Sequence, residues 1–309
     1  MNKVIVTTTI NSPSKAIKFF AQKKGWSLII IGDLITPHEL FRKLEKENKN
    51  VIYLSPKDQE IRYPKLSKAI GWRKIQRRNI GYVEAYRLGA DVVASVDDDN
   101  IPLKGWGENL LVGKTIEVNY YRTKLESFDP IGATNYPQLW HRGYPLQLLS
   151  KRDYKNKTRK EINPDIQAGF WNGDPDVDAI CRMEYSPECE FKDKYFPIAS
   201  NKISPFNSQN TFLSRNVLKN YFLFPFVGRM DDIWASFYVQ AQNYKVIYTR
   251  ASVYQERNEH DLTVDMKKEY LGYEQNLELL KTLYKDPSSI FRFLPKEAIK
   301  AFEIYQKEF

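Results

Sequence analysis

Short apolar segments alternate with helix-prone segments over the first hundred residues, and few architectures accommodate this order. The apolar segments, rich in Val and Ile, are 4–10, 26–31, 51–54 and 91–96. The helix-prone segments between them are 14–23, 37–48 and 66–88. Apolar strands that do not alternate with polar residues are typical of a parallel sheet covered by helices on both faces. We therefore predict an α/β fold of the nucleotide-binding type with a mostly parallel sheet.

The rest of the chain changes character twice. Residues 101–195 are rich in Pro, Gly and aromatic residues, which predicts long loops and short strands over a site. The basic stretch 151–160 lies in this region, and a solvated surface is the alternative explanation for it. Helical patterns return at 231–242, 264–284 and 295–307. We predict a main domain at 1–262, which has two halves at 1–100 and 101–262. A helical C-terminal extension follows at 263–309, and it packs on the body, a partner subunit or a membrane surface.

The charge balance predicts an anionic partner. The 309 residues include 47 Lys and Arg against 38 Asp and Glu, a net charge of +9. Nucleic acid, an acidic membrane surface and a phosphorylated small molecule all fit this excess. We expect no nucleic-acid partner, because the basic residues are not part of an RNP or helix-turn-helix motif.

Cysteine use and hydropathy bear on the compartment. Cys181 and Cys189 lack companions at zinc-ligand spacing, so we predict neither a disulfide framework nor a zinc knuckle. The first ten residues are too short and too polar for a signal peptide, and no apolar run approaches the roughly 20 residues of a membrane helix. We therefore expect a cytoplasmic protein without a transmembrane segment. The sequence leaves peripheral membrane contact and the oligomeric state open.

Three adjacent acids follow the fourth apolar segment directly. Asp97, Asp98 and Asp99 would lie at the carboxyl edge of the sheet, where open α/β sheets bind ligands. Adjacent carboxylates repel one another unless a cation compensates them. Carboxylate oxygens suit Mg²⁺ or Mn²⁺, which would bridge Asp97 and Asp99 to a diphosphate. A solvated acidic turn is the alternative explanation.

Cations and polar groups before this triplet are candidates for binding a nucleotide. The segment 72–81 concentrates Lys and Arg on the helix that precedes the acidic strand, and some of them would neutralise phosphates while others cover the helix surface. Asp33 ends the second strand and would accept hydrogen bonds from a base or ribose, or cap the following turn. The nucleotide-binding candidates from this half of the chain are Thr8, Asp33, Lys74, Arg78, Asn79, Asp97 and Asp98.

A second acidic pair opens a predicted helix. Asp231 or Asp232 would serve as the N-cap, which accounts for one acid but not for both. The positive end of a helix also keeps a carboxylate ionised, as a base that deprotonates a sugar hydroxyl requires.

Several motifs in consistent order carry a resemblance to a known family. They are RRNIGYVEAYRLGAD followed by DDDN, WNGDPDVDAICR (171–182), FNSQNTFLSR (206–215) and GRMDDIW (228–234). Together they look like GT-A glycosyltransferases of the STELLO type. They are also similar to the reversibly glycosylated polypeptide, or UDP-arabinopyranose mutase, family. The mutase comparison extends to HRGYPLQL (141–148) and MKKEYLGYEQN (266–276).

The resemblance implies a GT-A fold and specific roles. Asp97 and Asp99 match the element that holds the metal and the diphosphate, and Asp231 and Asp232 match the acidic pair near the acceptor. We expect Asp232 to be the general base. The remaining matched positions are Gly173, Asp174 and Asp176 in the donor-sugar loop, and Arg142, which matches the region of the self-glycosylated Arg of plant mutases. The loop NGDPDVDA is more acidic than in the mutases and the flanks of Arg142 differ, which counts against mutase activity more than against the fold.

A late histidine completes the candidates. Many GT-A enzymes use a late His as a third metal ligand, and His260 is one of three His in the chain. Gln255 aligns at least as well with the corresponding His of the mutases, and a surface His without a metal role is the simpler explanation for His260.

We therefore expect a metal-dependent glycosyltransferase that moves a sugar from a nucleoside diphosphate, with UDP-sugars as the first candidates, to the hydroxyl of a carbohydrate acceptor, by inversion or retention. The first alternative is an isomerase of the mutase type, which would change the ring form of the sugar without an acceptor. The second is a non-catalytic nucleotide-sugar binder that regulates another transferase.

Overall fold

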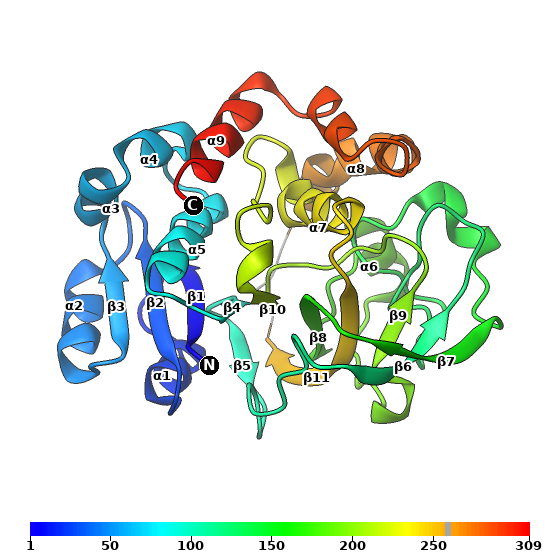
Figure 1. The fold of residues 1–309 in the computed structure, drawn as a ribbon, viewed down its shortest axis with the longest axis horizontal. Coiled ribbons are helices and arrows are strands. Elements are labelled where there is room, and N and C mark those ends of the chain that lie inside the picture. Colours follow the sequence, from blue (N-terminus) through cyan, green and yellow to red (C-terminus); the bar gives the residue numbers. More distant parts are fainter. Residues whose placement is uncertain (257–260) are drawn as a thin grey trace.

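One mixed sheet runs through the whole molecule, with helices packed on it (Figure 1). The structure is a computed structural model that describes residues 1–256 and 261–309. The strand order is β3-β2-β1-β4-β10-β8-β11-β9-β6-β7, and β5 pairs with β11. The strands are β1 (Lys3–Thr9), β2 (Ser27–Gly32), β3 (Val51–Leu54), β4 (Val92–Val96), β5 (Asn100–Pro102), β6 (Ile116–Tyr121), β7 (Lys157–Ile162), β8 (Ile166–Gly173), β9 (Ile198–Ser200), β10 (Asn210–Ser214) and β11 (Val246–Gln255).

The helices cover both halves of the sheet. They are α1 (Lys15–Gln22), α2 (His38–Glu47), α3 (Pro56–Arg62), α4 (Pro64–Ile70), α5 (Arg78–Arg87), α6 (Ala179–Tyr185), α7 (Asp231–Ala241), α8 (Leu262–Leu283) and α9 (Lys296–Gln306). Short 3₁₀ turns lie between them, of which η1 (Ile75–Arg77) and η5 (Gly228–Met230) matter for the site. The predicted α/β architecture, with a mostly parallel sheet, flanking helices and a helical C-terminal region, is confirmed.

The N-terminal half is a parallel sheet built as the sequence predicts. Strands β3, β2, β1 and β4 are parallel neighbours, and every residue of β4 is buried. The chain moves outward from β1 to β2 and β3 and then returns to the other side of β1 with β4. This reversal creates a crevice at the carboxyl ends of β1 and β4, where open α/β sheets bind ligands.

The prediction of one continuous helix over 66–88 is wrong. Helix α4 ends at Ile70 and is capped by Gly71, whose φ of +79° is a backbone conformation that glycine adopts without strain. The chain then turns through η1 before α5 begins, and α3, which the periodicity missed, precedes α4. The break matters because it places the loop 71–76 beside the crevice.

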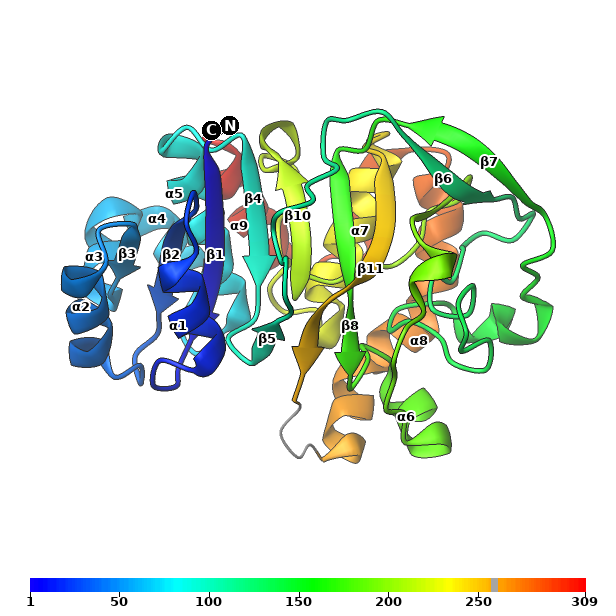
Figure 2. The same ribbon diagram turned by 90° about the horizontal axis from the view of Figure 1, so that it is seen from below.

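The second half of the sheet joins the first through an antiparallel strand. Strand β10 pairs with β4 in the register Asn210 to Val96, so the residues that precede β10 lie beside those that follow β4. Strand β8 is antiparallel to β10 and parallel to β11. Of the strands in the described residues, seven (β1–β4, β7, β8 and β11) share one direction. Helix α7 lies behind β10, β8 and β11 in Figure 2.

The C-terminal helices pack on the body. Helix α9 returns to the N-terminal half and contacts α4 (Figure 1). The Tyr305 hydroxyl donates a hydrogen bond of 2.6 Å to the carbonyl oxygen of Leu218, and Phe302 is buried. Among the described helices, none is both long and apolar enough to cross a membrane. The division into domains at residue 262 stays a prediction, since one hydrophobic core includes residues from both sides of it.

The two cysteines are free and buried. Burial raises the pKa of the Cys181 thiol and of the Cys189 thiol to about 12, so both remain protonated at neutral pH.

Candidate active site

Two neighbouring cavities open at the carboxyl edge of the parallel strands. The first, which we call the β1–β2 cavity, has a volume of about 470 Å³, and its wall includes the ends of β1 and β2, the loop 73–75 and Asp98. The second, the acidic cavity, has a volume of about 260 Å³ and contains Asp97, Asp99 and the start of α7. Ile75 lines both, so one loop forms a wall of each cavity.

Side chains from two segments hold Asp97 and Asp98 of the acidic triplet. The Arg78 guanidinium, which is fully buried, donates a hydrogen bond of 2.5 Å to Oδ1 of Asp97. The Thr9 hydroxyl and the Asn11 amide donate to Oδ2 of Asp98 at 2.5 and 3.3 Å. Burial raises the pKa of Asp97, and the positive charge of Arg78 opposes this shift. The Arg78 guanidinium thus compensates part of the negative charge of the triplet, for which we predicted a metal cation.

Asp33 lies in the β1–β2 cavity with its carboxylate fixed by backbone groups. Its oxygens accept hydrogen bonds from the N–H groups of Leu34 at 2.6 Å and Lys74 at 3.2 Å. Thr8 and Lys74 line the same cavity. The Lys74 ammonium lies 3.6 Å from the centre of the Phe226 ring, and burial lowers its pKa.

The two acids at the start of α7 have different environments. Asp232 accepts two hydrogen bonds from Arg142, of 3.0 and 3.2 Å, and one of 3.0 Å from the N–H of Ser208. Asp231 accepts a hydrogen bond of 2.8 Å from the side chain of Gln76. Burial and the neighbouring Asp232 carboxylate raise the pKa of Asp231 to about 7.

Neither of these acids is an N-cap. Residue 230 precedes the helix, and no side-chain cap bond is present there among the described residues. The prediction that one of the two acids caps α7 is therefore wrong, because both lie within its first turn.

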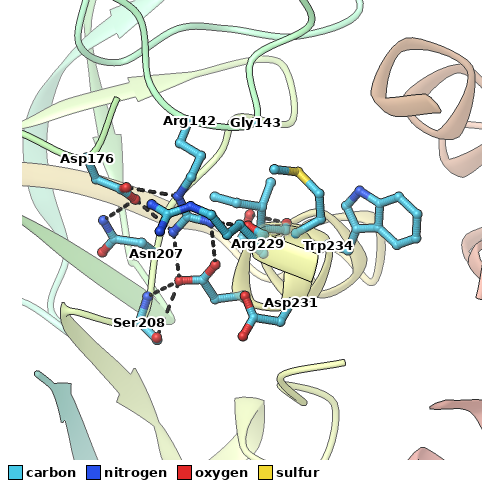
Figure 3. A network of polar contacts seen from close by, with 12 residues as sticks. Arg142, Gly143, Asp176, Asn207, Ser208, Arg229, Asp231 and Trp234 are labelled. Atoms are coloured by element: carbon cyan, nitrogen blue, oxygen red, sulfur yellow. Dashed lines mark hydrogen bonds and ion pairs between the residues drawn. The ribbon is translucent and has the colours of Figure 1, made fainter. Parts of the chain in front are cut away.

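Arg142 connects the acidic pair to the loop after β8 (Figure 3). Its guanidinium donates to both carboxylate oxygens of Asp176, at 2.8 and 2.9 Å, on the side opposite to Asp232. Asp176 is fully buried and also accepts a hydrogen bond of 2.8 Å from Asn207. Burial by itself would raise the pKa of Asp176, but the charge of Arg142 outweighs it and holds the pKa well below the usual range.

The structure brings most of the predicted site residues together, but not all. Thr8, Asp33, Lys74 and Asp98 line the β1–β2 cavity, and Asp97, Asp99, Arg142, Asp231 and Asp232 line the acidic cavity. Arg78 contacts Asp97 but is not among the described lining residues of either cavity. Among the described lining residues of the two cavities, Asn79, Gly173, Asp174 and Asp176 are missing. His260 lies outside the described residues, so its predicted role as a metal ligand stays a prediction.

Those four residues have identifiable contacts elsewhere. The Asn79 side chain exchanges two hydrogen bonds of 2.9 Å with the backbone of Leu223, which ties α5 to the chain after β10. Gly173 pairs its backbone with Cys189, and Asp174 forms an ion pair with Arg182. Asp176 is the buried partner of Arg142. The candidate roles of all four in donor binding stay predictions.

Several functional candidates escaped the sequence analysis. Gln76, Ser208, Gln209 and Arg229 line the acidic cavity. Ser208, Gln209 and Arg229 lie within the motifs that carry the resemblance, and Gln76 directly precedes RRNIGYVEAYRLGAD. The motifs do not indicate that β10 is antiparallel to β4. This pairing places residues 207–209 next to the acidic triplet.

Gln255 is the most informative of the lining residues. It ends β11, pairs with Gly173 and Asn100, and has only 4% of its surface exposed. Its Oε1 atom is buried without a hydrogen-bond partner among the described residues, although buried acceptors are normally satisfied. The acidic cavity therefore contains a neutral oxygen that a ligand would satisfy.

Comparisons with known proteins support the predicted resemblance. No family model matches the chain. The chain is 24% identical over 229 residues to probable glycosyltransferase STELLO2 of Arabidopsis thaliana, and 25% identical over 229 residues to probable glycosyltransferase STELLO1 of the same plant. Each alignment covers 68% of this chain and 29% of the relative, so the chain spans less than a third of the length of these relatives.

Solved structures give weaker matches. Glucosyl-3-phosphoglycerate synthase from Mycobacterium tuberculosis aligns with a TM-score of 0.47 at 10% identity, over 90% of this chain and 80% of that chain. The mannosyltransferase PcManGT from Pyrobaculum calidifontis, solved with GDP-Man and Mn²⁺, aligns with a TM-score of 0.46 at 10% identity, over 99% and 69%. These scores are too low to support a conclusion. The resemblance to the STELLO glycosyltransferases, which the motifs predict, is confirmed over about two thirds of the chain.

Proposed function

We propose that this chain is a metal-dependent glycosyltransferase that moves a sugar from a nucleoside diphosphate to an acceptor hydroxyl. The observation that carries this proposal is the pair of neighbouring cavities, one suited to a nucleoside and one crowded with carboxylates. The similarity to two probable glycosyltransferases supports it. Because the chain covers only part of those relatives, the activity has to be tested on this chain itself.

The β1–β2 cavity has the chemistry of a nucleoside site. Ile10, Ile35 and Ile75 line it and are each more than two fifths exposed, which leaves apolar surface for the faces of a base. Asp33 supplies a fixed acceptor for a base N–H or a ribose hydroxyl. Small-molecule sites combine apolar walls with a few fixed polar groups in this way. UDP-sugars are the first donors to test.

The acidic cavity has the chemistry of a cation site. Four carboxylates line it, those of Asp97, Asp99, Asp231 and Asp232. Of the two guanidiniums that line it, that of Arg229 also pairs with Asp265 and Glu269 on α8. Buried negative charge in such excess is costly unless a cation compensates it.

A divalent ion fits the oxygen atoms that are present. Asp97, Asp99 and the unsatisfied Oε1 of Gln255 would hold Mg²⁺ or Mn²⁺, and the ion would stabilise the charge of the leaving diphosphate. No group of three His, Cys, Asp or Glu in the described part of the chain is arranged to hold an ion by itself. Mg²⁺ is commonly held by one or two carboxylates together with substrate phosphates, so this donor set is sufficient.

Asp231 is the better general base of the two acids in α7. Among the described residues, the side-chain donor to Asp231 is Gln76, whereas both oxygens of Asp232 face Arg142. A base works best when its pKa is close to the working pH, and the pKa of Asp231 is raised to about 7. We therefore assign proton abstraction from the acceptor hydroxyl to Asp231 in place of Asp232.

The proposal is tested by nucleotide binding and by donor cleavage. Melting temperatures would be measured with UDP, GDP and CMP, each with and without Mn²⁺, on wild type and Asp99→Asn. A ligand that binds the folded state alone raises the melting temperature. We expect a shift that requires Mn²⁺ in wild type and that is lost in Asp99→Asn.

Asp193→Asn is the matched control, because Asp193 is exposed and pairs with the exposed Arg250 away from the acidic cavity. A Mn²⁺-dependent shift that survives Asp99→Asn would refute the assignment of the metal site. Release of UDP from UDP-sugars is then followed with and without sugar acceptors. A sugar that changes its ring form without an acceptor would indicate the mutase reaction instead.

A further inference from the structure

We propose that Arg142 is a positioning residue, which fixes Asp232 and the start of α7, and that it neither binds the donor nor accepts a sugar. Its structural role follows from the contacts alone. Its role in turnover rests on the function proposed above.

The guanidinium of Arg142 has no donor left for a substrate. A guanidinium carries five N–H groups. Two are directed at Asp176, from Nε at 2.8 Å and Nη2 at 2.9 Å. Two are directed at Asp232, from Nη1 at 3.0 Å and Nη2 at 3.2 Å, and Nη1 also donates to the carbonyl oxygen of Arg229. These five contacts account for all five N–H groups.

The backbone around Arg142 is fixed as firmly as its side chain. The N–H of Arg142 donates a hydrogen bond of 3.0 Å to the carbonyl oxygen of Asp176. A Cβ atom at Gly143 would lie 2.3 Å from Cγ2 of Ile233, so only glycine allows this turn to pack directly on α7 (Figure 3). The carbonyl oxygen of Gly143 accepts a hydrogen bond of 2.8 Å from Asn276 on α8.

The contacts of Arg142 join segments that are distant in the sequence. Asp176 follows β8, Asp232 lies in α7, and Ser208, whose N–H donates to Asp232, precedes β10. Arg142 itself is 5% exposed. A planar guanidinium can pair with two carboxylates at once, whereas the ammonium of lysine is a point charge with three donors.

These observations exclude donor binding and sugar acceptance as roles of Arg142. A protonated guanidinium has no lone pair to attack a sugar. Burial by itself would lower the pKa of Arg142, but the carboxylates on both sides of it outweigh this effect and raise the pKa. A phosphate would have to displace one of two buried carboxylates, each of which would then lose its partner. Arg142 thus orients the acidic pair, and Asp231 is left with its separate contact to Gln76.

The first experiment measures stability and needs no substrate. Arg142→Met leaves two buried carboxylates unpaired, and we expect the melting temperature to fall by about 8 °C. Adding Asp232→Asn to this variant removes one unpaired charge and is expected to restore about half of the loss. A melting temperature of Arg142→Met close to that of wild type, or a double variant no more stable than the single one, would overturn the proposal.

Arg152→Met is the matched control. Arg152 is a largely buried arginine that pairs with Asp129 at 2.5 Å and donates to the carbonyl oxygen of Leu139, and it lines neither cavity among the described residues. We expect a comparable loss of stability, with unchanged UDP binding and turnover below the melting temperature.

The second experiment separates positioning from donor binding. In Arg142→Lys, we expect the affinity for UDP with Mn²⁺ to change by less than about threefold, while kcat for UDP-sugar cleavage falls about 100-fold because the acidic pair is misplaced. A donor-binding role predicts the reverse, a large loss of UDP affinity with kcat retained, and would refute the proposal.

A sugar-acceptor role is tested by the mass of the Arg142 peptide after wild type is incubated with UDP-sugar and Mn²⁺. We expect an unmodified peptide, and a glycosylated Arg142 would refute the proposal. If wild type binds no nucleotide at all, the proposed function fails, but the melting experiment still decides whether Arg142 fixes α7.

Discussion

The two cavities are built in different ways from one chain. The polar wall of the β1–β2 cavity comes from strand ends and nearby turns, and Asp33 is held by backbone N–H groups. In the acidic cavity, ion pairs join residues that are up to 90 positions apart, as between Arg142 and Asp232. The first kind of site follows from local structure, whereas the second requires the whole fold. Changes in the acidic cavity should therefore affect both stability and turnover, and changes in the β1–β2 cavity should mainly affect affinity.

The largest expected effect is that of Asp231→Asn. Loss of a general base should lower kcat about 1000-fold, or about 4 kcal/mol in the barrier, with UDP affinity retained. The measurement is UDP release under saturating donor and acceptor. Asp153→Asn, at an exposed position, is the control. A variant that keeps a tenth or more of the wild-type rate would show that Asp231 is not the base.

The next effect is structural and concerns Arg78. Arg78→Met would leave the largely buried Asp97 unpaired and should lower the free energy of unfolding by about 3 kcal/mol. Urea denaturation measures this loss. Arg62→Met is the comparison, because the pair of Arg62 with Glu84 has its guanidinium 47% exposed and should contribute no more than about 1 kcal/mol. Equal midpoints for the two variants would contradict the importance of the buried pair.

A third effect is the pH dependence of stability. Burial and the neighbouring Asp232 raise the pKa of Asp231 in the folded state to about 7 from its ordinary value of 3.8, so the folded state binds this proton more tightly than the unfolded state. The resulting stabilisation is complete below pH 3.8 and is lost as the pH rises through about 7. Asp231→Asn should therefore gain stability relative to wild type as the pH rises from 3.8 to about 7, and the difference should stay constant above that pH. Parallel curves of unfolding free energy against pH for the two proteins would exclude the raised pKa.

The smallest effect tests the β1–β2 cavity alone. Asp33→Asn should weaken UDP binding about tenfold, or about 1.4 kcal/mol, because one fixed charged acceptor is lost. UDP binding by Asp33→Asn should still depend on Mn²⁺, whereas Asp99→Asn should lose this dependence. Calorimetric titration with and without Mn²⁺ measures both quantities. Unaltered UDP affinity in Asp33→Asn would place the nucleoside elsewhere.

The sequence predicts the first half of the molecule well. Strands β1 to β4 carry continuous apolar runs whose burial determines their position, and the acidic triplet has to follow β4 wherever that strand lies. The sheet, the flanking helices and the helical C-terminal region follow from periodicity in the same way. The grouping of Asp97 with Asp231 and Asp232 came from the family resemblance, because no local pattern links residues so far apart.

What the sequence does not predict depends on side chains that meet across the fold. Nothing local indicates that Arg142 pairs with two acids, or that Asp232 is thereby fixed while Asp231 keeps a raised pKa. The continuous helix expected over 66–88 failed for a related reason. The apolar spacing there is compatible with one helix, and the left-handed conformations at Gly71 and Arg73 divide it.

That division has a consequence for anyone who wishes to alter the specificity of this protein. Between Gly71 and α5, the backbone of Lys74 supports Asp33, the side chain of Gln76 supports Asp231, and Ile75 separates the two chambers. This strip of chain borders both chambers, so a substitution in it that enlarges one chamber also displaces the wall of the other. Selectivity for the nucleoside and reactivity toward the acceptor should therefore change together when this strip is mutated, and independent retuning has to start from residues outside it.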